Sequence, residues 1–571
     1  MDDTRWIIRS GDASVAHSLI QTLAIPPIVA RVLAARELVD PDEVRQFLDP
    51  RLERLPSPFL LKGMERAVGC VIDALRERRP IVVWGDYDVD GVTSTVQLVS
   101  FLGALGAAVE YYIPHRDEGY GLSLAGVERL ARPGLLLITV DCGTSNIVEI
   151  ARARELGCDV VVLDHHQVPG QLPDATAFVN PQQSGCDYPF RGLATAGLSF
   201  QLLMALRRRL REGGLFATIA EPNLGDYLDL VALGTVADAV PLVGPNRILV
   251  HFGLRQINRT RRTGMRALID VCERTRLDAG DLGFQLAPRI NAAGRLAGAK
   301  LGVELLLSTD PEHCRELALQ LDGLNRRRRE IEDETLRAAE ESLAPQLVDG
   351  APPPFIVVAG EGWHHGVVGI VAARLMEKYW RPTIVLARDG GLAKGSARSI
   401  AGFDMVAGLR RVATPLEKFG GHAMAAGLTL ATTSIDGLRE ELQQIAQEVL
   451  REEQWRKPIK IDLEVDLDEL DSASVEQVLR LGPFGVGNPR PVFLTRPRRI
   501  SEFCTLKEKH VRFLSWGSTR PFKSIGFNMA ARLPEPPPEL EIVFSPHLRE
   551  FRGCEQLEFH LRDIRPRGAR G

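Results

Sequence analysis

The stretch "VVWGDYDVDGVTSTV" (residues 82–96) places Asp86, Asp88 and Asp90 at alternate positions directly after a run of apolar residues. The apolar run predicts a buried strand, and the acids follow at its carboxyl end. Carboxylates held this closely repel one another in a folded chain unless a cation lies among them. The stretch therefore predicts a strand whose end carries a cation site.

The same alternation of strand and helix continues beyond this stretch. "TSTVQLVSFLGALG" (93–106) predicts a helix that Thr93 or Ser94 caps and Gly106 ends. Alternating strands and helices of this length are typical of a parallel sheet with helices on both faces. Three further strands are predicted in "AAVEYYIP" (107–114), "GLLLITVDCG" (134–143) and "CDVVVLDHH" (158–166).

Acidic residues and histidines stand where these strands end. In an open parallel sheet the carboxyl ends of the strands border one ligand crevice, so these side chains are expected to converge. Oxygen ligands with one or two imidazoles suit Mn²⁺ or Mg²⁺ better than a thiolate-bound zinc, and a bridging carboxylate would make a two-metal hydrolytic centre. A calcium loop is disfavoured because Gln97 stands where a glutamate is needed. The converging residues are Asp86, Asp88, Asp90, Asp141, Asp164, His165, His166 and Asp238.

Composition and charge restrict the class of protein. The 571 residues carry a net charge of −4, but residues 490–571 hold 16 basic against 9 acidic residues. A basic tail on an acidic body favours a polyanionic partner. The eight cysteines are scattered, and neither a signal core nor an apolar run of membrane length is seen. A cytoplasmic protein without a membrane or disulfide framework is expected.

Changes in the pattern of apolar and polar residues along the chain predict five structural regions. A helical region (1–78) precedes the parallel-sheet domain (79–310), and a long helix (311–345) leads to a second α/β pattern. Alternating short apolar stretches near the C-terminus predict a small antiparallel barrel. The last two units are expected at 351–455 and 457–571.

Several motifs together resemble a known superfamily. "DYDVDG", "VDCG", "LDHH" and "GTVAD", in this order, are similar to the signature of the DHH phosphoesterases. "PRINAAGRL" (288–296), "GWHHGVVGIVAARL" (362–375), "GSARS" (395–399) and "GGHAMAAG" (420–427) resemble the RecJ branch. That resemblance implies a DHH domain, a DHHA1-like second domain, an OB-like C-terminal barrel, and exonuclease activity on single-stranded DNA from the 5′ end.

The resemblance also implies roles for single residues. Asp88, Asp90, Asp141, His165 and Asp238 fall on the metal ligands, with Asp141 as the bridge between two ions. Asp86 is a further ligand or a support of one. His166 is expected to face the scissile phosphate, the alternative being that it supports a metal ligand. The catalytic set is thus His166, Asp141 and His165.

Cationic, hydroxyl and glycine positions are expected to hold the 5′-terminal phosphate. Each arginine could instead form a surface ion pair. "NRRRRE" (325–330) favours a solvated helix with internal ion pairs over a nucleic-acid patch. Of Phe513, Trp516, Phe522 and Phe527, about half are expected to be free to stack on bases while the others fill the barrel. The expected substrate-binding residues are Arg116, Arg295, His364, Ser396, Arg398, Gly421 and His422.

The sequence thus predicts an α/β phosphodiesterase that uses two Mn²⁺ or Mg²⁺ ions to degrade single-stranded DNA to mononucleotides in DNA repair and recombination. The alternatives are a DHH phosphodiesterase acting on short oligonucleotides and an inactive single-strand-binding scaffold. Single-stranded DNA is the expected partner, with a single-strand-binding protein and a helicase as candidate protein partners of a monomer. The choice of metal and activity on RNA stay open, and the polarity rests on the resemblance alone.

Overall fold

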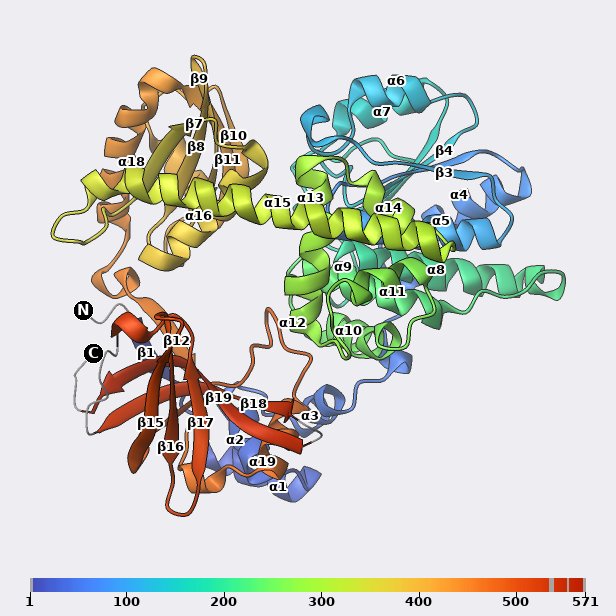
Figure 1. Ribbon diagram of the computed structural model, residues 1–571. Helices are drawn as coiled ribbons and strands as arrows, with labels where there is room; N and C mark the ends of the chain where they lie inside the picture. The colour runs from blue at the N-terminus through green and yellow to red at the C-terminus, as the bar shows by residue number, and fades with distance from the viewer. Residues whose placement is uncertain (1–3, 533–538, 552–553, 568–571) are drawn as a thin grey trace.

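The computed structural model describes residues 4–532, 539–551 and 554–567 (Figure 1). Its first sheet has the order β3-β2-β4-β5-β6, with all neighbours parallel. This sheet and its helices form what we call the first lobe (residues 61–307). The strands are β2 (Ile81–Trp84), β3 (Val109–Tyr112), β4 (Leu136–Val140), β5 (Asp159–Leu163) and β6 (Ala177–Val179).

Both faces of this sheet are buried, as the continuous apolar strands predict. Ile81 and Val83 belong to one apolar core, while Val82 and Trp84 belong to another on the opposite face. Helices α6 (Leu124–Leu130) and α7 (Ile147–Glu155) contribute to the second core. The first core is built with α4 (Met64–Arg76), α5 (Val89–Ala104), α8 (Thr195–Glu212) and α9 (Leu228–Ala237).

The first helix after the Asp-rich stretch begins earlier than predicted. The prediction that Thr93 or Ser94 caps it is wrong, because α5 begins at Val89 and Asp88 is its N-cap. The Asp88 carboxylate accepts hydrogen bonds from the backbone N–H groups of Asp90 and Gly91 at 2.9 and 3.1 Å. A short acid satisfies the free amides of a first turn at least as well as a hydroxyl does.

Helix α15 (Pro311–Leu343) connects the first lobe to the second and is 33 residues long. Near its start, Leu317 and Leu321 belong to the core of the first lobe. Near its end, Ala339 and Leu343 belong to the core of the second lobe (residues 355–450). Figure 1 shows it running across both lobes. Between α9 and α15 lie α10 (Gly244–Ile257), α11 (Thr263–Asp270), α12 (Ala279–Asp281), α13 (Ala287–Leu296) and α14 (Lys300–Leu307).

The second lobe has a mixed sheet of order β10-β11-β9-β8-β7, in which only β7 and β8 are parallel among its paired strands. Helices α16 (His365–Tyr379), α17 (Met405–Arg411) and α18 (Ile435–Val449) pack against it. Its strands are β7 (Ile356–Glu361), β8 (Thr383–Asp389), β9 (Leu392–Arg398), β10 (Lys418–His422) and β11 (Ala425–Ala431).

The C-terminal sheet has the order β13-β14-β18-β19-β17-β16-β15. The predicted barrel is mostly antiparallel, but β13 runs parallel to β14 and β17 parallel to β19. β19 lies between β18 and β17 in the sheet, antiparallel to β18 and parallel to β17. The strands are β13 (Leu463–Glu464), β14 (Phe493–Thr495), β15 (Arg499–Leu506), β16 (His510–Trp516), β17 (Pro521–Gly526), β18 (Leu540–Phe551) and β19 (Cys554–Pro566), and α19 (Ser472–Leu479) covers the core.

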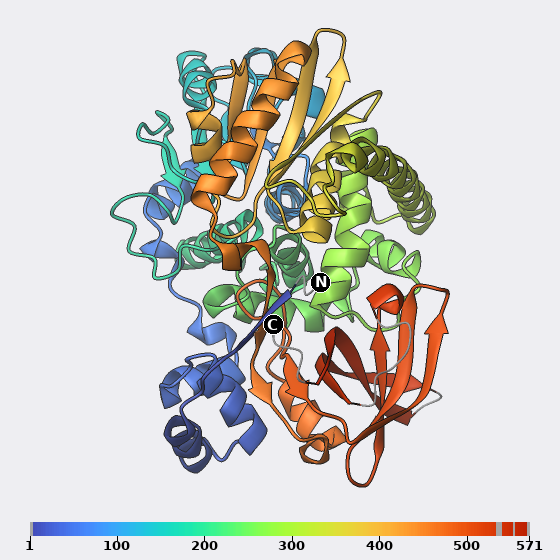
Figure 2. The same cartoon turned by 90° about the vertical axis from the view of Figure 1, so that its left-hand side faces the viewer.

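The N-terminal region packs on the C-terminal sheet, with which it shares one apolar core (Figure 2). The expectation that it is helical throughout is wrong, because β1 (Thr4–Ile8) pairs in parallel with β12 (Lys457–Ile461). Thr4 and Trp6 both donate hydrogen bonds to the buried carboxylate of Asp563, which fixes this strand. The helices that follow are α1 (Ala13–Leu23), α2 (Pro27–Ala35) and α3 (Pro41–Leu48).

Among the described residues, no helix combines the length and apolar character needed to cross a bilayer.

Candidate metal centre

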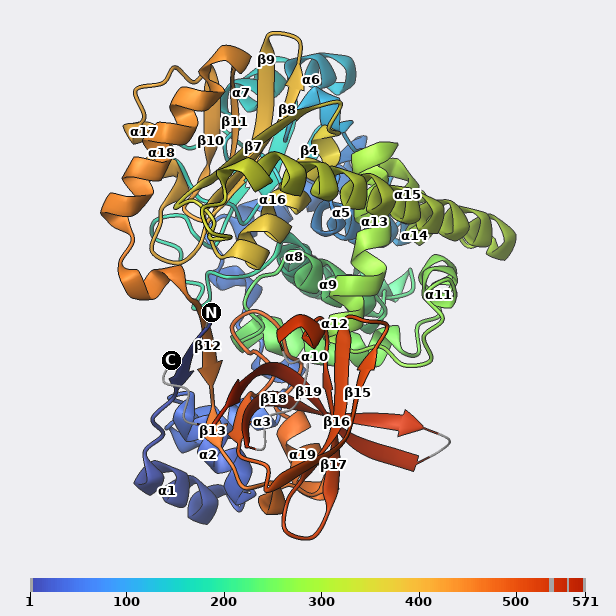
Figure 3. The ribbon, with the colours of Figure 1, turned by 60° about the vertical axis from the view of Figure 1, so that its left-hand side comes forward.

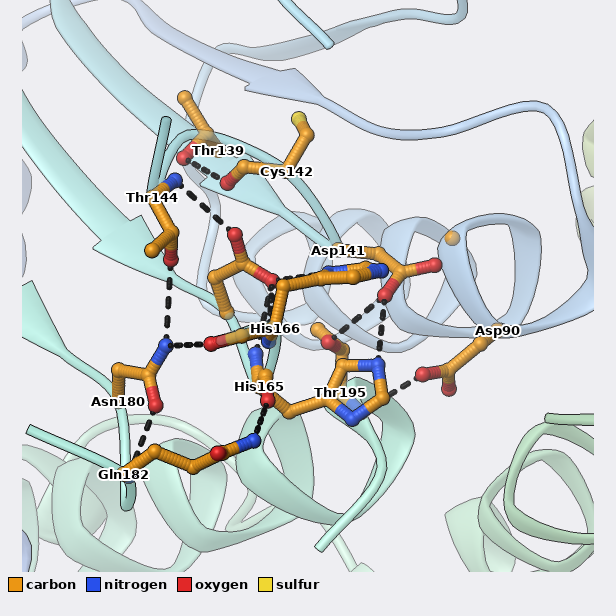
Figure 4. Close-up of polar contacts among 12 residues, drawn as sticks. Asp90, Thr139, Asp141, Cys142, Thr144, His165, His166, Asn180, Gln182 and Thr195 are labelled. Atoms are coloured by element: carbon orange, nitrogen blue, oxygen red, sulfur yellow. Dashed lines mark hydrogen bonds and ion pairs between the residues drawn. The ribbon is translucent and has the colours of Figure 1, made fainter. Parts of the chain in front are cut away.

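The residues predicted to converge come together at the carboxyl ends of β2, β4 and β5 and at the end of α9. Figure 4 shows Asp90, Asp141, His165 and His166 of this set. Among the described residues, three groups have potential ligand atoms within 4.8 Å of one another. Asp141 belongs to two of these groups, and so does His165. The groups are Asp86 with Asp88 and Asp141, Asp90 with His165 and Asp238, and Asp141 with His165 and His166.

Asp86 and Asp88 leave the strand in a tight turn. A Cβ atom on Gly91 would lie 2.6 Å from the backbone N and O atoms of Asp86, so glycine is required for the close approach of helix α5. Asp86 is 2% exposed, and its Oδ1 atom is buried without a hydrogen-bond partner among the described residues. A buried oxygen of this kind is costly unless a ligand occupies the space in front of it.

Asp90 faces the N-terminus of α8. Its two carboxylate oxygens accept hydrogen bonds from the backbone N–H groups of Thr195 and Ala196, each at 2.7 Å. Burial, followed by the charge of Asp88, raises the pKa of Asp90 to about 7. The predicted role of Asp90 as a metal ligand therefore has to use the remaining lone pairs of oxygens that already hold a helix end.

Asp141 stands at the end of β4 with a left-handed backbone, at a φ of 63°. This conformation is unfavourable for a residue with a side chain and is typical of functional positions. Asp141 is 2% exposed, and its Oδ1 atom accepts a hydrogen bond of 3.0 Å from Thr195 Oγ1. The same oxygen lies 3.5 Å from His165 Nε2. Asp141 thus lies where the residue groups overlap.

His165 points its Nε2 atom between two carboxylates, at 3.5 Å from Asp141 and 3.4 Å from Asp238. Neither this nitrogen nor Asp238 Oδ2 has a hydrogen-bond partner among the described residues, although both atoms are buried. Burial, and then the charge of His166, lower the pKa of His165 to about 4. The imidazole is therefore neutral near pH 7 and keeps a lone pair for a cation.

His166 has the opposite electrostatic character. Burial alone would lower its pKa, but a hydrogen bond of 2.7 Å between its Nδ1 atom and Asp164 raises that pKa to about 9. Its side chain is 44% exposed, so a cationic imidazolium faces the open side of the centre. Asp164 is held in turn by the backbone N–H groups of Thr144 and His165, at 3.0 and 2.7 Å. Asp164 thus supports His166 and belongs to none of the three ligand groups.

Several residues that shape the centre were not predicted from the sequence. Tyr120 Oη donates to the backbone oxygen of Asp141 at 2.8 Å and lies 3.1 Å from His166 Nδ1. Asn180 donates to the backbone oxygen of His166 at 2.9 Å, and Gln182 donates to that of His165. Tyr120 and Asn180 lie in segments without a strand-end acid, so no pattern in the sequence distinguishes them.

The electrostatics of the centre favour a bound cation. Burial and mutual repulsion raise the pKa of Asp86, Asp141 and Asp238, that of Asp238 to about 9. Among the described residues, no lysine or arginine forms an ion pair with these carboxylates. Carboxylate oxygens and a neutral imidazole are ligands that suit Mn²⁺ and Mg²⁺. The donor set and its unpaired buried atoms therefore fit divalent metal.

The predicted phosphate-binding arginines come from three elements of the two lobes. Arg295 in α13 donates to the backbone oxygen of Gly366 at 2.6 Å, which ties the first lobe to α16. Arg116 lies over the ring of Tyr87 at 4.3 Å and donates to Gly294. Burial, followed by the charges of Arg116, Arg328 and Arg398, lowers the pKa of Arg295 to about 10. These guanidinium groups thus lie close enough to repel one another.

The strand register brings the remaining predicted residues into two rows. Ser396, Gly427 and Gly420 are aligned across β9, β11 and β10, and Arg398, Ala425 and His422 are aligned two residues further along. Arg398 also donates to Ser396 Oγ at 3.1 Å. Gly421 has a φ of 144° and lies on β10 between the two rows.

His364 is the N-cap of α16, and its Nδ1 atom accepts a hydrogen bond of 3.0 Å from Gly366 N–H. Because Nδ1 is used as a helix cap, the predicted contact with substrate would have to be made by the other atoms of the exposed His364 ring.

The "NRRRRE" segment is only partly a solvated helix face. Arg326 and Arg327 are 68% and 60% exposed and form ion pairs within α15, as predicted. Arg328 contradicts that interpretation, because its side chain is 11% exposed and donates to Glu332 and Asn325. Glu332 is itself buried and pairs with Arg374 of α16. Four consecutive arginines on a helix cannot all face solvent when that helix packs against a lobe.

The aromatic residues of the C-terminal sheet divide between core and surface. Phe513 and Phe522 are buried, at 1% and 4% exposure, and belong to the apolar core. Trp516 is half-buried under Arg499, at 4.1 Å. Phe527 is 54% exposed, with the rings of His510 and His560 at 5.5 and 5.6 Å. Phe527 is therefore the free stacking surface among the four predicted residues.

Comparison with known proteins agrees with this architecture. Three family models match the chain: the DHH family N-terminal domain over residues 80–235, the DHHA1 domain over 353–449 and the RecJ OB domain over 461–563. The single-stranded-DNA-specific exonuclease RecJ of Dickeya dadantii is 40% identical, over 95% of this chain and 96% of its own. The protein of that name from Escherichia coli is 38% identical over the same shares.

A crystal structure of RecJ from Thermus thermophilus in complex with Mn²⁺ superposes with a TM-score of 0.83 at 32% identity. The match covers 99% of this chain and 80% of that one. The arrangement of a DHH lobe, a DHHA1 lobe and a C-terminal OB domain is thus common to these proteins. The chain belongs to the RecJ family of single-stranded-DNA-specific exonucleases.

Proposed function

We propose that this protein is a metal-dependent exonuclease that hydrolyses single-stranded DNA from the 5′ end to mononucleotides, in DNA repair and recombination. The observation that carries the proposal is the overlap of the ligand groups at Asp141. A carboxylate that belongs to two ligand groups could bind both ions of a two-metal centre. The proposed ligands are Asp86, Asp88, Asp90, Asp141, His165 and Asp238, and the proposed cofactor is two Mn²⁺ or Mg²⁺ ions.

Two divalent ions held there would supply a hydroxide nucleophile and neutralise negative charge on the phosphoryl group. The low pKa of His165 leaves its imidazole neutral near pH 7, so its lone pair is available to bind a metal ion and it does not act as a proton donor. His166 is charged and donates a hydrogen bond to a phosphate oxygen from the open side, while Asp164 holds its Nδ1 atom. Tyr120 limits the rotation of His166 through its contact with the ring.

The proposed 5′ polarity rests on the family resemblance, and the cationic groups beyond the metal centre support binding of a strand end. Arg116, Arg295 and Arg398 with Ser396 would grip a terminal phosphate through charge-assisted hydrogen bonds. An internal phosphodiester carries one negative charge and offers fewer free oxygens than a terminal monoester. A site built to hold the 5′-terminal group therefore admits the strand end first.

The C-terminal domain would hold the following nucleotides. Phe527 offers an exposed ring, and Arg490 and Arg562 lie near the stacked rings of His547 and His560, whose centroids are 3.7 Å apart. Exposed rings among cationic side chains are typical of surfaces that bind single strands.

The test compares 5′-labelled and 3′-labelled DNA, single-stranded and duplex, in Mn²⁺, with wild type and Asp141→Asn. The proposal expects mononucleotides released first from the 5′ side of single strands and none with the variant. Cleavage limited to dinucleotides and similar short substrates would favour a DHH phosphodiesterase for oligonucleotides. Wild-type protein that binds single strands without cutting them would favour a scaffold.

The proposed protein partners are a single-strand-binding protein and a helicase, with the nuclease itself a cytoplasmic monomer. Support for them rests on the family resemblance. Light scattering of the purified protein and co-sedimentation with each candidate partner test these proposals separately from activity.

A further inference from the structure

The C-terminal domain carries a small rigid turn, Gly485–Asn488, that reaches the first lobe (Figure 3). We call it the 485–488 turn. Gly485 and Asn488 exchange backbone hydrogen bonds of 2.9 and 3.2 Å, which close it. The buried side chain of Asn488 donates to the backbone oxygens of Leu481 and Pro483, each at 2.9 Å. The turn therefore presents its tip in a fixed place.

The tip of the turn contacts the chain that directly follows Asp238. Leu242 N–H donates to the backbone oxygen of Val486 at 2.7 Å. A Cβ atom on Gly487 would lie 3.0 Å from Pro241 Cβ, and one on Gly485 would lie 2.7 Å from Leu242 Cδ1. Glycine at both positions thus lets the backbone of one domain approach the other closely.

The segment between Asp238 and Leu242 depends on such outside support. It leaves α9 through Ala239, whose φ of 57° is unfavourable for a residue with a side chain. On the side of the first lobe, Asn246 Nδ2 donates to Pro241 O at 3.0 Å. Leu242 is 1% exposed and belongs to an apolar cluster against which Val236 packs, and Val236 lies in the last turn of α9 before Asp238. A shift of Leu242 would therefore reach Asp238 along the backbone through Ala239 and through the side-chain packing of Val236.

Two arginines hold the turn and the first lobe together. Arg247 in α10 is 2% exposed and donates to the backbone oxygens of Leu481 and Phe47, at 2.8 and 3.0 Å. Its guanidinium group lies 3.7 Å from the ring centroid of Phe47. Arg490 forms an ion pair with Asp278 at 3.3 Å. The turn cannot shift relative to the first lobe without breaking these contacts.

We propose that the 485–488 turn is a positioning element for Asp238. By fixing Leu242 and Pro241, it sets the place of the Asp238 carboxylate, 3.4 Å from His165 Nε2. The C-terminal domain then has a second role beside DNA binding, because it increases the affinity of the Asp90, His165 and Asp238 group for its cation. This inference rests on the proposed function of Asp238 as a metal ligand.

The chain offers a matched pair of glycines for the test. Gly487 and Gly350 have nearly the same positive φ, 74° and 78°. A Cβ atom on Gly350 would meet nothing within 4 Å, whereas one on Gly487 would meet Pro241. Gly350→Val therefore places a branched side chain at a similar positive φ, as Gly487→Val does, but without a steric clash against Pro241. Gly487→Ala gives a milder form of the same clash.

The measurement is Mn²⁺ binding to the full chain, followed by the electron paramagnetic resonance signal of free Mn²⁺, with thermal unfolding as the check of folding. Groups that orient metal ligands change affinity by about 10–100-fold when altered. Gly487→Val is expected to weaken the binding of one of two ions by about that factor, and Gly487→Ala by less. Gly350→Val should bind as wild type does. Nuclease activity of Gly487→Val should return when Mn²⁺ is raised, with the maximal rate little changed.

Wild-type Mn²⁺ affinity in folded Gly487→Val or Gly487→Ala would overturn the inference, as would equal weakening in Gly350→Val. Asp238→Asn separates this failure from that of the proposed function. If Asp238→Asn binds Mn²⁺ as wild type does, the assignment of Asp238 is wrong. If it binds weakly while the Gly487 variants bind normally, only the role of the turn is wrong.

Discussion

Binding of Mn²⁺ should release protons, because the metal-free centre keeps some of its carboxyls protonated. Burial and mutual repulsion raise the pKa of Asp90 to about 7 and that of Asp238 to about 9. At pH 7, Asp90 is then about half protonated and Asp238 almost fully. A bound cation needs both as carboxylates, so their ionisation contributes about 1.5 protons released per protein. Because the two acids interact, these protons belong to the pair.

Titration calorimetry in buffers of different ionisation enthalpy measures this number at pH 7. Asp238→Asn removes the acid with the higher pKa, so its release should fall by about one proton. Asp229→Asn is the matched control, because Asp229 is also buried with a raised pKa but is hydrogen-bonded to Thr260 away from the ligand groups. No proton release by wild type, or equal release by Asp238→Asn, would refute the reasoning.

The same pKa shifts predict how stability depends on pH without metal. A carboxyl whose pKa is higher in the folded chain than in the unfolded chain stabilises the fold below its unfolded value of about 4. That contribution is lost as the pH rises through the folded values near 7 and 9. The melting temperature of the metal-free protein should therefore fall between pH 5 and pH 9, and the increase on adding Mn²⁺ should grow over the same range. A Mn²⁺ effect that shrinks with rising pH would contradict this.

Three further predictions concern single residues. Asp141→Asn should weaken Mn²⁺ binding more than about 100-fold and abolish nuclease activity while single-strand binding persists; retained activity would reject the shared ligand. Arg398→Gln should slow cleavage of 5′-phosphorylated strands about 10–100-fold, from the loss of charge-assisted hydrogen bonds, and should affect 5′-hydroxyl strands much less; equal losses on both would argue against a phosphate contact. Phe527→Ala should cost about 1–3 kcal/mol of single-strand binding, measured by fluorescence anisotropy with the melting temperature unchanged, and unaltered binding would remove Phe527 from the DNA surface.

The convergence of distant acids could be predicted because it follows from topology. A parallel sheet brings the ends of its strands to one edge, so the apolar runs before Asp86, Asp141 and His165 were enough to place them together. Asp238 was harder, because it ends a helix rather than a strand. The lone acid after a long apolar stretch was the signal that identified it.

Contacts made by single side chains were beyond the reach of pattern. Asp90 holds the N-terminus of α8, about a hundred residues away, and Tyr120 reaches His166 from a loop. The pattern that identifies Asp90 as a metal ligand does not indicate its contact with α8, and nothing in the local sequence distinguishes Tyr120 from a surface tyrosine. Arg328 differs from its neighbours only in facing inward, which depends on how α15 packs and not on the arginines themselves.

The N-terminal strand shows a second limit. Thr4–Ile8 contains the β-branched and aromatic residues typical of a strand, but a strand is stable only when paired, and its partner could not be identified from the local sequence. Its partner, β12, lies some 450 residues further along the chain. Contacts of this range, like that between the 485–488 turn and Leu242, follow from the docking of whole domains.

The most direct test of the central claim is anomalous X-ray scattering at the manganese edge from crystals of the protein soaked in Mn²⁺. The account predicts two peaks about 3.5–4 Å apart with Asp141 bound to both. Density at a single position away from Asp141, or peaks that leave Asp88, His165 and Asp238 without a cation, would contradict it.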